Sequence, residues 1–177
     1  MGPDLLDLYD RGSAWAVEVV SGAVNDLDAT TPCEEWNVRT LLNHMLDAQR
    51  YFLSAARGEQ ASPPGATAPE ILSDDPAGDF RKMRTDMLAA YSDPEVRERT
   101  GISLGIAFSD LLLHTWDLAR ATGQDETLDP DKCAEMLEGM LPMDEALRQS
   151  GHYGPRVAVP ADADVQTRLL AFIGRTP

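Results

Sequence analysis

The sequence predicts an all-α protein, and three observations support this fold class. Apolar residues recur at the spacing of an amphipathic helix in five successive long segments. The alternation of apolar and polar residues that indicates strands is rare. Proline and glycine gather between the periodic segments rather than inside most of them. We therefore expect one domain over residues 1–177, built as an antiparallel four-helix bundle with short C-terminal additions.

The first two helices are predicted over residues 4–24 and 38–57. Residues 25–37 are expected to form a loop, and Asn37 is expected to cap the second helix. The apolar residues of the first helix recur at helical spacing: Leu5, Leu8, Trp15, Ala16 and Val19. Those of the second helix form a stripe: Leu41, Leu42, Met45, Leu46 and Phe52.

The third helix is predicted over residues 76–91. Residues 58–69 precede it and are rich in alanine, serine, proline and glycine, which predicts the most flexible part of the chain, either a lid or a linker. Residues 92–101 are expected only to turn the chain back. The inward-facing residues of this helix are predicted to be Phe80, Met83, Met87 and Leu88.

The fourth helix, over residues 103–121, is the most apolar of the chain. Gly123 is expected to close it as a C′ glycine, because glycine adopts the left-handed conformation at low cost. The apolar residues of this helix are Leu104, Ile106, Phe108, Leu111, Leu112 and Leu113.

The fifth helix is expected to begin after Asp129, with Pro130 at its first position, and to continue to about residue 149. Pro142 should kink or break it, because proline lacks the backbone N–H that a helix interior requires. An extended segment over residues 151–160 and a short helix over 164–173 are expected to follow.

Charge and hydropathy limit the partners that are expected. Thirty acidic residues against fifteen basic ones give a formal charge of −15, with no run of Lys or Arg. This charge repels nucleic acid and anionic membranes. No stretch approaches the roughly 20 apolar residues that span a bilayer, and the start, MGPDLLDLYDRG, carries acids where a signal peptide carries bases. We therefore expect a cytoplasmic protein without nucleic-acid or membrane partners.

Two of the three histidines lie on helix faces that are expected to meet. His44 lies on the core side of the second helix, and His114 lies in the middle of the fourth. Asp110 precedes His114 by four residues, so the two side chains project from one face. Together the three can offer donors to one divalent ion and leave positions open, as catalytic metal sites do. The donors suit Zn²⁺ or Ni²⁺ first, with Fe²⁺ and Mn²⁺ as alternatives.

Other interpretations of these residues stay open. An Asp-x-x-x-His pair is commonly a simple hydrogen-bonded pair, and a histidine on a core face is commonly a satisfied core residue. Asp117, three residues after His114, either replaces Asp110 at the ion or orients the histidine ring from outside the ligand set. His152 lies in a predicted loop, in GHYGPRV, without an acidic companion and is left out of the site.

The cysteines and tryptophans are expected to be structural. Cys33 and Cys133 form no CxxC pair, and no base is apparent beside either of them. Trp36 and Trp116 are expected in the core or in a pocket wall. The sequence contains no Gly-rich phosphate loop, no GxSxG and no HExxH, which argues against kinase, hydrolase and dehydrogenase functions.

Three blocks carry a family resemblance over nearly the whole chain: TPCEEWNVRTLLNHML, DLLLHTWDLARATG and GHYGPRVAVPADADVQTRLLAFIGRTP. Together they resemble an actinobacterial family of short metal-binding proteins in the DinB/YfiT-like superfamily. That family is related to the N-terminal domain of mycothiol-dependent maleylpyruvate isomerase. The resemblance implies a DinB-like four-helix bundle with a metal ion held by His44, Asp110 and His114. Relatives also carry His or Glu at the position of Asp110, so the coordination count or the metal preference of this chain is expected to differ from theirs.

The resemblance also implies a function. Relatives use low-molecular-weight thiols such as mycothiol in transferase and isomerase reactions, in which a metal-bound thiolate attacks a small electrophile. The isomerase has an additional C-terminal domain, whereas this sequence ends at Pro177, so maleylpyruvate isomerisation itself is not expected. Arg120 and Arg156 could bind an anionic substrate, but their positive charge is the only feature that suggests this role. Superfamily members often form homodimers, although no segment here marks an interface.

Three hypotheses about function therefore remain. The first is a metal- and thiol-dependent transferase or isomerase, and the open ligand positions favour it. The second is a non-catalytic helical module that binds a metal or a small ligand, favoured by the missing second domain and by the lack of an assigned acid or base. The third is an interaction protein with a vestigial site.

Overall fold

A computed structural model of the chain describes residues 4–33, 35–65, 67–150 and 153–177. These residues form helices and loops with no β-strand among them, apart from an isolated bridge between Thr30 and Asn37. The all-α class is therefore confirmed. The chain divides into two compact units, Met1–Glu126 and Thr127–Pro177. A single domain over the whole chain stays a prediction.

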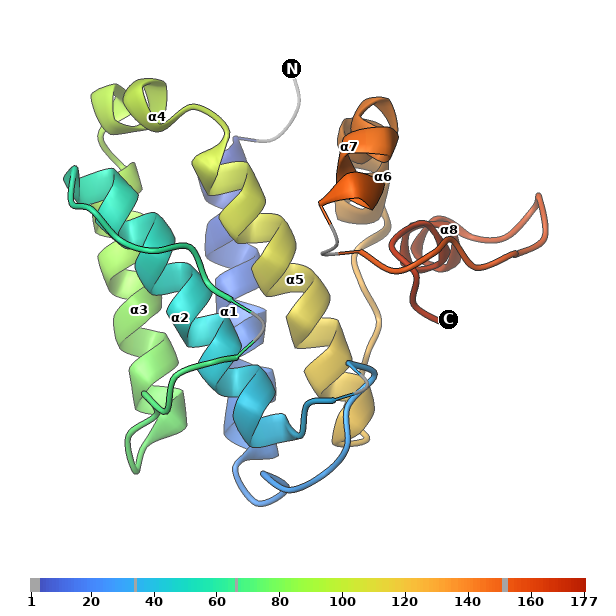
Figure 1. Cartoon of the computed structure of the whole chain (residues 1–177), viewed down its shortest axis with the longest axis horizontal. Coiled ribbons are helices and arrows are strands. Elements are labelled where there is room, and N and C mark those ends of the chain that lie inside the picture. Colours follow the sequence, from blue (N-terminus) through green and yellow to red (C-terminus); the bar gives the residue numbers. More distant parts are fainter. Residues whose placement is uncertain (1–3, 34, 66, 151–152) are drawn as a thin grey trace. The chain divides into compact units, whose positions relative to one another are not determined.

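The four longest helices belong to the N-terminal unit: α1 (Leu5–Ala23), α2 (Val38–Arg57), α3 (Pro76–Tyr91) and α5 (Ser103–Ala121). Helix α1 packs against α3 and α5, and α2 packs against the same two helices (Figure 1). These bounds confirm the predicted positions of the four helices. No helix in the described part of the chain is long and apolar enough to cross a membrane.

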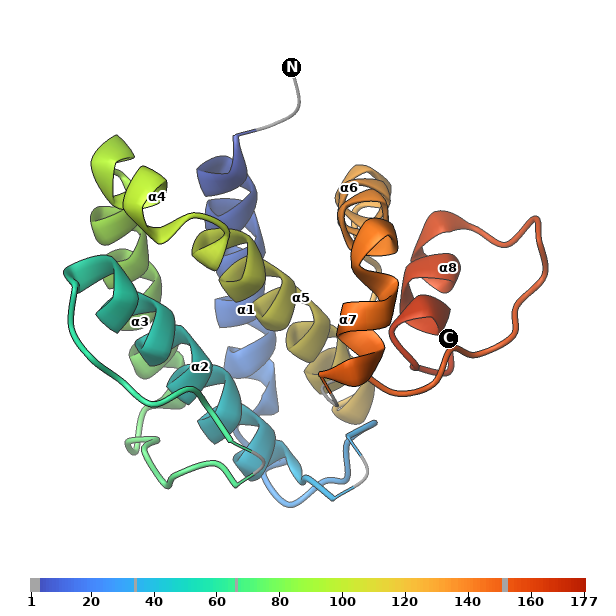
Figure 2. The same cartoon turned by 45° about the horizontal axis from the view of Figure 1, so that its top comes forward.

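Helices α2 and α3 run in the same direction. Asn43, near the start of α2, accepts hydrogen bonds from the backbone N–H groups of Ile71 (2.6 Å) and Leu72 (3.0 Å), just before α3. The hydroxyl of Tyr91, at the end of α3, donates to the carbonyl of Phe52 near the end of α2. The segment between the helices returns along α2 (Figure 2), so this pair departs from the antiparallel order expected from the sequence.

Local signals fix the helix ends. The Asn37 side chain accepts a hydrogen bond from the Thr40 N–H at 2.9 Å, which confirms the predicted N-cap of α2. Gly123 has a φ of +66° after α5, as expected for a C′ glycine. Residues 92–101 were expected only to turn, but they contain a short helix, α4 (Pro94–Thr100). Asp93 caps this helix, and proline at its first position favours it.

Most of the predicted apolar stripes are buried in the core of the N-terminal unit, including Leu41, Leu42, Met45 and Leu46 of α2. Ile106 is the exception in α5, because 46% of its surface is exposed. Leu5, Trp15 and Leu88 are only partly buried. The helical spacing therefore predicted which face of each helix points inward better than it predicted the edges of that face.

A buried polar link sets the register of α2 against its neighbours. The Tyr9 hydroxyl of α1 donates to Oε1 of Gln49 at 2.8 Å. The Nε2 of Gln49 donates to the backbone carbonyl of Ala107 in α5 at 3.0 Å. Because a buried polar group without a partner costs roughly 1–3 kcal/mol, this pair of bonds disfavours other registers. Gln49 lies five residues after His44, and Ala107 three before Asp110.

The C-terminal unit contains α6 (Pro130–Met140), a 3₁₀ turn (Leu141–Met143), α7 (Asp144–Gln149) and α8 (Val165–Phe172). The predicted break at Pro142 is confirmed, since this proline lies in the 3₁₀ turn. Helix α6 packs against α8. The Arg148 guanidinium donates to the carbonyl of Phe172 at 2.8 Å, which joins α7 to the end of α8.

Candidate metal centre

The structure brings the three predicted ligands together. Helix α2 supplies His44, and α5 supplies Asp110 and His114. The Asp110 Oδ1 lies 3.6 Å from Nε2 of His44 and 3.7 Å from Nε2 of His114. One donor atom from each residue lies within 4.8 Å of the other two.

Two levels of structure produce this convergence. Asp110 and His114 share a face of α5 because they are four residues apart in an α-helix. His44 reaches them across the α2–α5 contact, where the bond from Gln49 to Ala107 holds the two helices in register. The histidine rings meet edge to face, with centroids 5.0 Å apart.

The two donor separations from Asp110 fit a divalent ion. Metal–nitrogen and metal–oxygen bonds of about 2.0–2.2 Å, at tetrahedral angles, place neighbouring donors roughly 3.3–3.6 Å apart. The separations of 3.6 and 3.7 Å from Asp110 therefore need adjustments of a few tenths of an ångström or less. Among the described residues, the buried Oδ2 of Asp110 has no hydrogen-bond partner. Two imidazole nitrogens and a carboxylate with a spare acceptor atom are a suitable ligand set.

The three side chains are largely but not fully covered. The exposed fraction is 12% for His44, 23% for Asp110 and 14% for His114. The three side chains therefore keep a small surface in contact with solvent. Three protein ligands with access to solvent are typical of catalytic metal sites rather than of closed structural ones.

Asp117 contacts Nδ1 of the His114 ring, the nitrogen that does not face Asp110 and His44. Its Oδ2 is 3.0 Å from His114 Nδ1, and the side chain has no exposed surface. This contact turns Nε2 toward Asp110 and His44. Of the two roles that the sequence left open for Asp117, the geometry favours orientation of the ring over replacement of Asp110.

The charges around His114 favour a cation there. Burial by itself lowers the pKa of this imidazole, but hydrogen bonds with Asp117 and Cys33 and the charges of Asp110 and Asp117 act the other way. Together they raise the pKa to about 10. At neutral pH the ring of the metal-free protein is therefore the cation, with a proton on each nitrogen. A metal ion must compete with one of these protons.

A hydrogen-bonded loop covers one side of the centre. In the described residues of this loop, the Thr31 hydroxyl donates to the carbonyl of Trp36 at 2.8 Å, and the Trp36 N–H donates to the carbonyl of Cys33 at 2.8 Å. The Trp36 ring lies 4.6 Å from the His44 ring between centroids and 6.0 Å from the His114 ring. Trp36 is therefore a wall of the centre, whereas Trp116 is buried in the core.

Cys33 corrects an expectation from the sequence. No base was apparent beside it, but its Sγ lies 3.4 Å from Oδ2 of Asp117 and 3.9 Å from Nδ1 of His114. More than 80 residues separate Cys33 from these partners, so no local spacing could reveal the contact. Cys133 is different, because it lies in the core of the C-terminal unit, where burial raises its pKa to about 11.

The remaining candidates lie elsewhere. His152 is outside the described residues. Arg120 pairs with Glu126, with 2.9 Å between Nε and Oε2, and Arg156 pairs with Asp144, with 2.8 Å between Nη2 and Oδ2. Both arginines therefore already have carboxylate partners, which weakens the case for either as a binding group for an anionic substrate.

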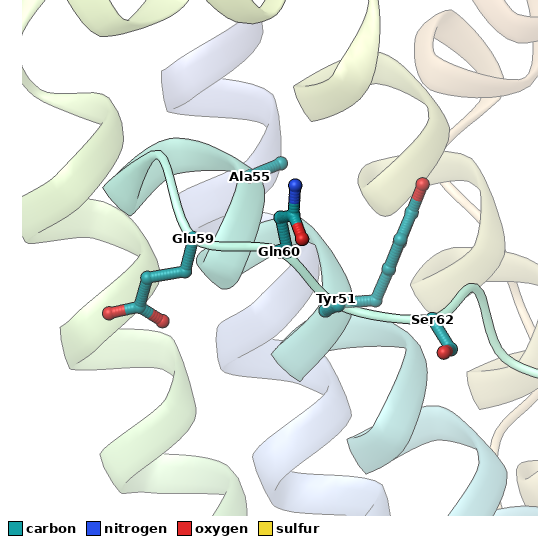
Figure 3. A pocket seen from close by; sticks show the side chains of 6 residues that line it. Tyr51, Ala55, Glu59, Gln60 and Ser62 are labelled. Carbon is teal, nitrogen blue, oxygen red and sulfur yellow. The ribbon is translucent and has the colours of Figure 1, made fainter.

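A surface pocket of about 440 Å³ lies between the end of α2 and the segment that follows it (Figure 3). It contains none of the three candidate metal ligands, so we assign it no part in the metal centre. Its lining residues are Tyr51, Ala55, Glu59, Gln60, Ala61 and Ser62.

Comparison with known proteins agrees with the resemblance of the three sequence blocks. Two proteins of Mycobacterium tuberculosis, MT0763 of strain CDC 1551 and Rv0738 of strain H37Rv, are both described as uncharacterized. Each is 26% identical to this chain over 168 residues, which cover 92% of both sequences. No solved structure matches the chain. The profile of the mycothiol maleylpyruvate isomerase N-terminal domain matches residues 12–119, more than half of the sequence, and the chain therefore belongs to that family.

Proposed function

We propose that this protein holds a divalent metal ion through His44, Asp110 and His114 within a DinB-like four-helix bundle. We further propose that it uses a low-molecular-weight thiol of the mycothiol type. In this reaction the thiol is either transferred to small electrophiles or used to isomerise them. The observation that carries the proposal is the approach of two Nε2 atoms to one carboxylate oxygen, at 3.6 and 3.7 Å. Membership of the mycothiol maleylpyruvate isomerase N-terminal domain family supports the choice of a thiol.

Each residue has a distinct part in this proposal. His44 and His114 offer neutral nitrogen donors, and Asp110 offers a negative oxygen that offsets part of the ion's charge. Asp117 holds the His114 ring through Nδ1, and Trp36 covers the face of the His44 ring. When bound, a divalent ion supplies Lewis acidity that lowers the pKa of a coordinated thiol. No cysteine of the chain has to act as the nucleophile.

The ion is expected to be Zn²⁺ or Ni²⁺, with Fe²⁺ and Mn²⁺ as alternatives, because nitrogen and carboxylate donors suit all four. The electrophile has to approach from the partly exposed side of the three ligands. Glu126 pairs with Arg120 and would compete with a substrate anion for this arginine.

Metal analysis of the tag-free protein tests the site. We expect near-stoichiometric metal in the wild type and its loss in His44→Ala and in His114→Ala. His152→Ala is the matched control, since it removes the remaining histidine of the sequence, and it should retain the metal. Absence of metal from the wild type after reconstitution with each of the four ions would refute the proposed site.

Turnover of a panel of small electrophiles then tests the reaction. We expect consumption that requires both the metal-loaded protein and the small thiol, and that disappears in His44→Ala. Stoichiometric metal without any thiol-dependent turnover would refute the enzymatic proposal. It would support the non-catalytic binding module instead.

A further inference from the structure

His114 takes part in two different groups of potential metal donors, one on each ring nitrogen. Its Nε2 faces His44 and Asp110, as described above. Its Nδ1 lies 3.0 Å from Oδ2 of Asp117 and 3.9 Å from Sγ of Cys33. The third side of this triangle, from Sγ of Cys33 to Oδ2 of Asp117, is 3.4 Å. We call Cys33, His114 and Asp117 the thiol set.

The distances in the thiol set suit a tetrahedral ion. Metal–sulfur bonds of about 2.3 Å and metal–nitrogen or metal–oxygen bonds of about 2.0–2.2 Å place sulfur roughly 3.5–3.7 Å from each of the other donors. They place nitrogen roughly 3.3–3.6 Å from oxygen. The separations found here, 3.4, 3.9 and 3.0 Å, therefore differ from these values by a few tenths of an ångström.

The positions of the three donors are held by independent parts of the fold. His114 and Asp117 lie three residues apart on α5, so they share a helix face. The loop holds Cys33 through its backbone: its N–H donates to the Thr31 hydroxyl at 3.1 Å, and its carbonyl accepts from the Trp36 N–H at 2.8 Å. The hydrogen bonds of the loop therefore hold the sulfur of Cys33 close to α5.

We propose that Cys33, His114 and Asp117 form a second cation site, selective for strongly thiophilic divalent ions such as Cd²⁺. Thiolate sulfur is a soft donor, whereas the first set offers only nitrogen and oxygen. When the ion binds, the Cys33 S–H proton and the proton between His114 Nδ1 and Asp117 pass to solvent, and bonds from the ion to Sγ, Nδ1 and Oδ2 replace them.

Occupation of this site affects the first one. A neutral imidazole has one lone pair available to a metal and carries its proton on the other nitrogen. An ion on Nδ1 of His114 therefore leaves the proton on Nε2, which can then no longer serve the first set. The two sites compete through one ring, and a thiophilic ion is expected to displace an ion held by His44, Asp110 and His114.

Titration of the metal-free, full-length protein with Cd²⁺ tests the proposal, because thiolate-to-cadmium charge transfer gives an ultraviolet absorption. We expect this absorption to saturate at one equivalent in the wild type and to vanish in Cys33→Ser and in Cys33→Ala. It should persist in Cys133→Ser, the matched control that removes the other thiol. It should also persist in His44→Ala, which impairs only the first set.

Four results would overturn the second site: no absorption in the wild type, absorption that survives both Cys33 variants, its loss in His44→Ala, or its loss in Cys133→Ser. In the last case the absorbing thiol would be the wrong one. The test is separate from that of the proposed function. Failure of the first site shows as a wild type that holds none of the four ions after reconstitution, while failure of the second shows only in the thiolate absorption with Cd²⁺.

Discussion

The Nδ1 atom of His114 lies 3.0 Å from Oδ2 of Asp117, a carboxylate without exposed surface. One turn of α5 thus contains both a proposed ligand and the group that orients it. The carboxylate fixes the ring so that Nε2 points to Asp110, and it favours a proton on Nδ1 rather than on Nε2. This relationship leads to the first prediction.

Asp117→Asn should weaken metal binding without abolishing it. The amide keeps the size of the side chain but loses the charge, so it holds the ring and its tautomer less firmly. Loss of such a supporting carboxylate typically lowers metal affinity by about 10- to 100-fold. Competition with a chromophoric chelator measures the change. An affinity equal to that of the wild type would show that Asp117 does not position the ring.

Metal affinity should fall as the pH falls. Since its neighbours raise the pKa of His114 to about 10 in the metal-free protein, the ring is protonated at neutral pH. Binding then releases about one proton from this ring, so the apparent affinity should rise about tenfold for each unit of pH between about 6 and 8. Chelator competition at several pH values gives this slope. A flat profile would contradict a protonated His114 in the metal-free state.

Gln49→Met should destabilise the protein. This side chain accepts from the Tyr9 hydroxyl and donates to the Ala107 carbonyl, and all three groups are buried. Methionine has a similar size but leaves both partners unsatisfied, at a cost of about 1–3 kcal/mol for each. Urea unfolding of the metal-free protein measures the loss. Gln60→Met, at an exposed position, is the control and should change the unfolding free energy by less than about 0.5 kcal/mol.

The two thiols should react with iodoacetamide at different rates. Burial raises the pKa of Cys133 from 9.0 to about 11, which lowers its thiolate fraction near pH 8 by about 100-fold. Cys33 is only partly buried. Mass spectrometry of peptides from the native protein should therefore find Cys33 modified first, and denatured protein should lose the difference. Faster modification of Cys133 would contradict its burial in the C-terminal core.

Much of the helical structure follows from local signals. Asn37 and the apolar stripe after it predict α2, Pro76 stands at the start of α3, and Gly123 follows the end of α5. Such caps and breakers act through neighbouring backbone groups, so they can be recognised without knowledge of the fold. Helix α4 was missed because it has only seven residues and no buried stripe to mark it.

The candidate site was only partly visible in the sequence. Asp110 and His114 could be paired because a helix places residues four apart on one face. The distance from His44 to that pair depended on the packing of α2 against α5. Cys33 and Trp36 belong to a loop whose sequence has no periodicity, so their place beside the histidines could not be predicted from the sequence.

The sequence by itself determined the all-α class, the ends of the long helices and the face of α5 that carries Asp110 and His114, because these depend on interactions within a few residues. Only the tertiary structure decided that α2 runs parallel to α3, that Asp117 contacts Nδ1 of His114, and that Cys33 joins them. The physical reason is that these contacts join residues from separate helices and loops, or depend on a ring orientation. They become favourable only when packing fixes the register of whole elements.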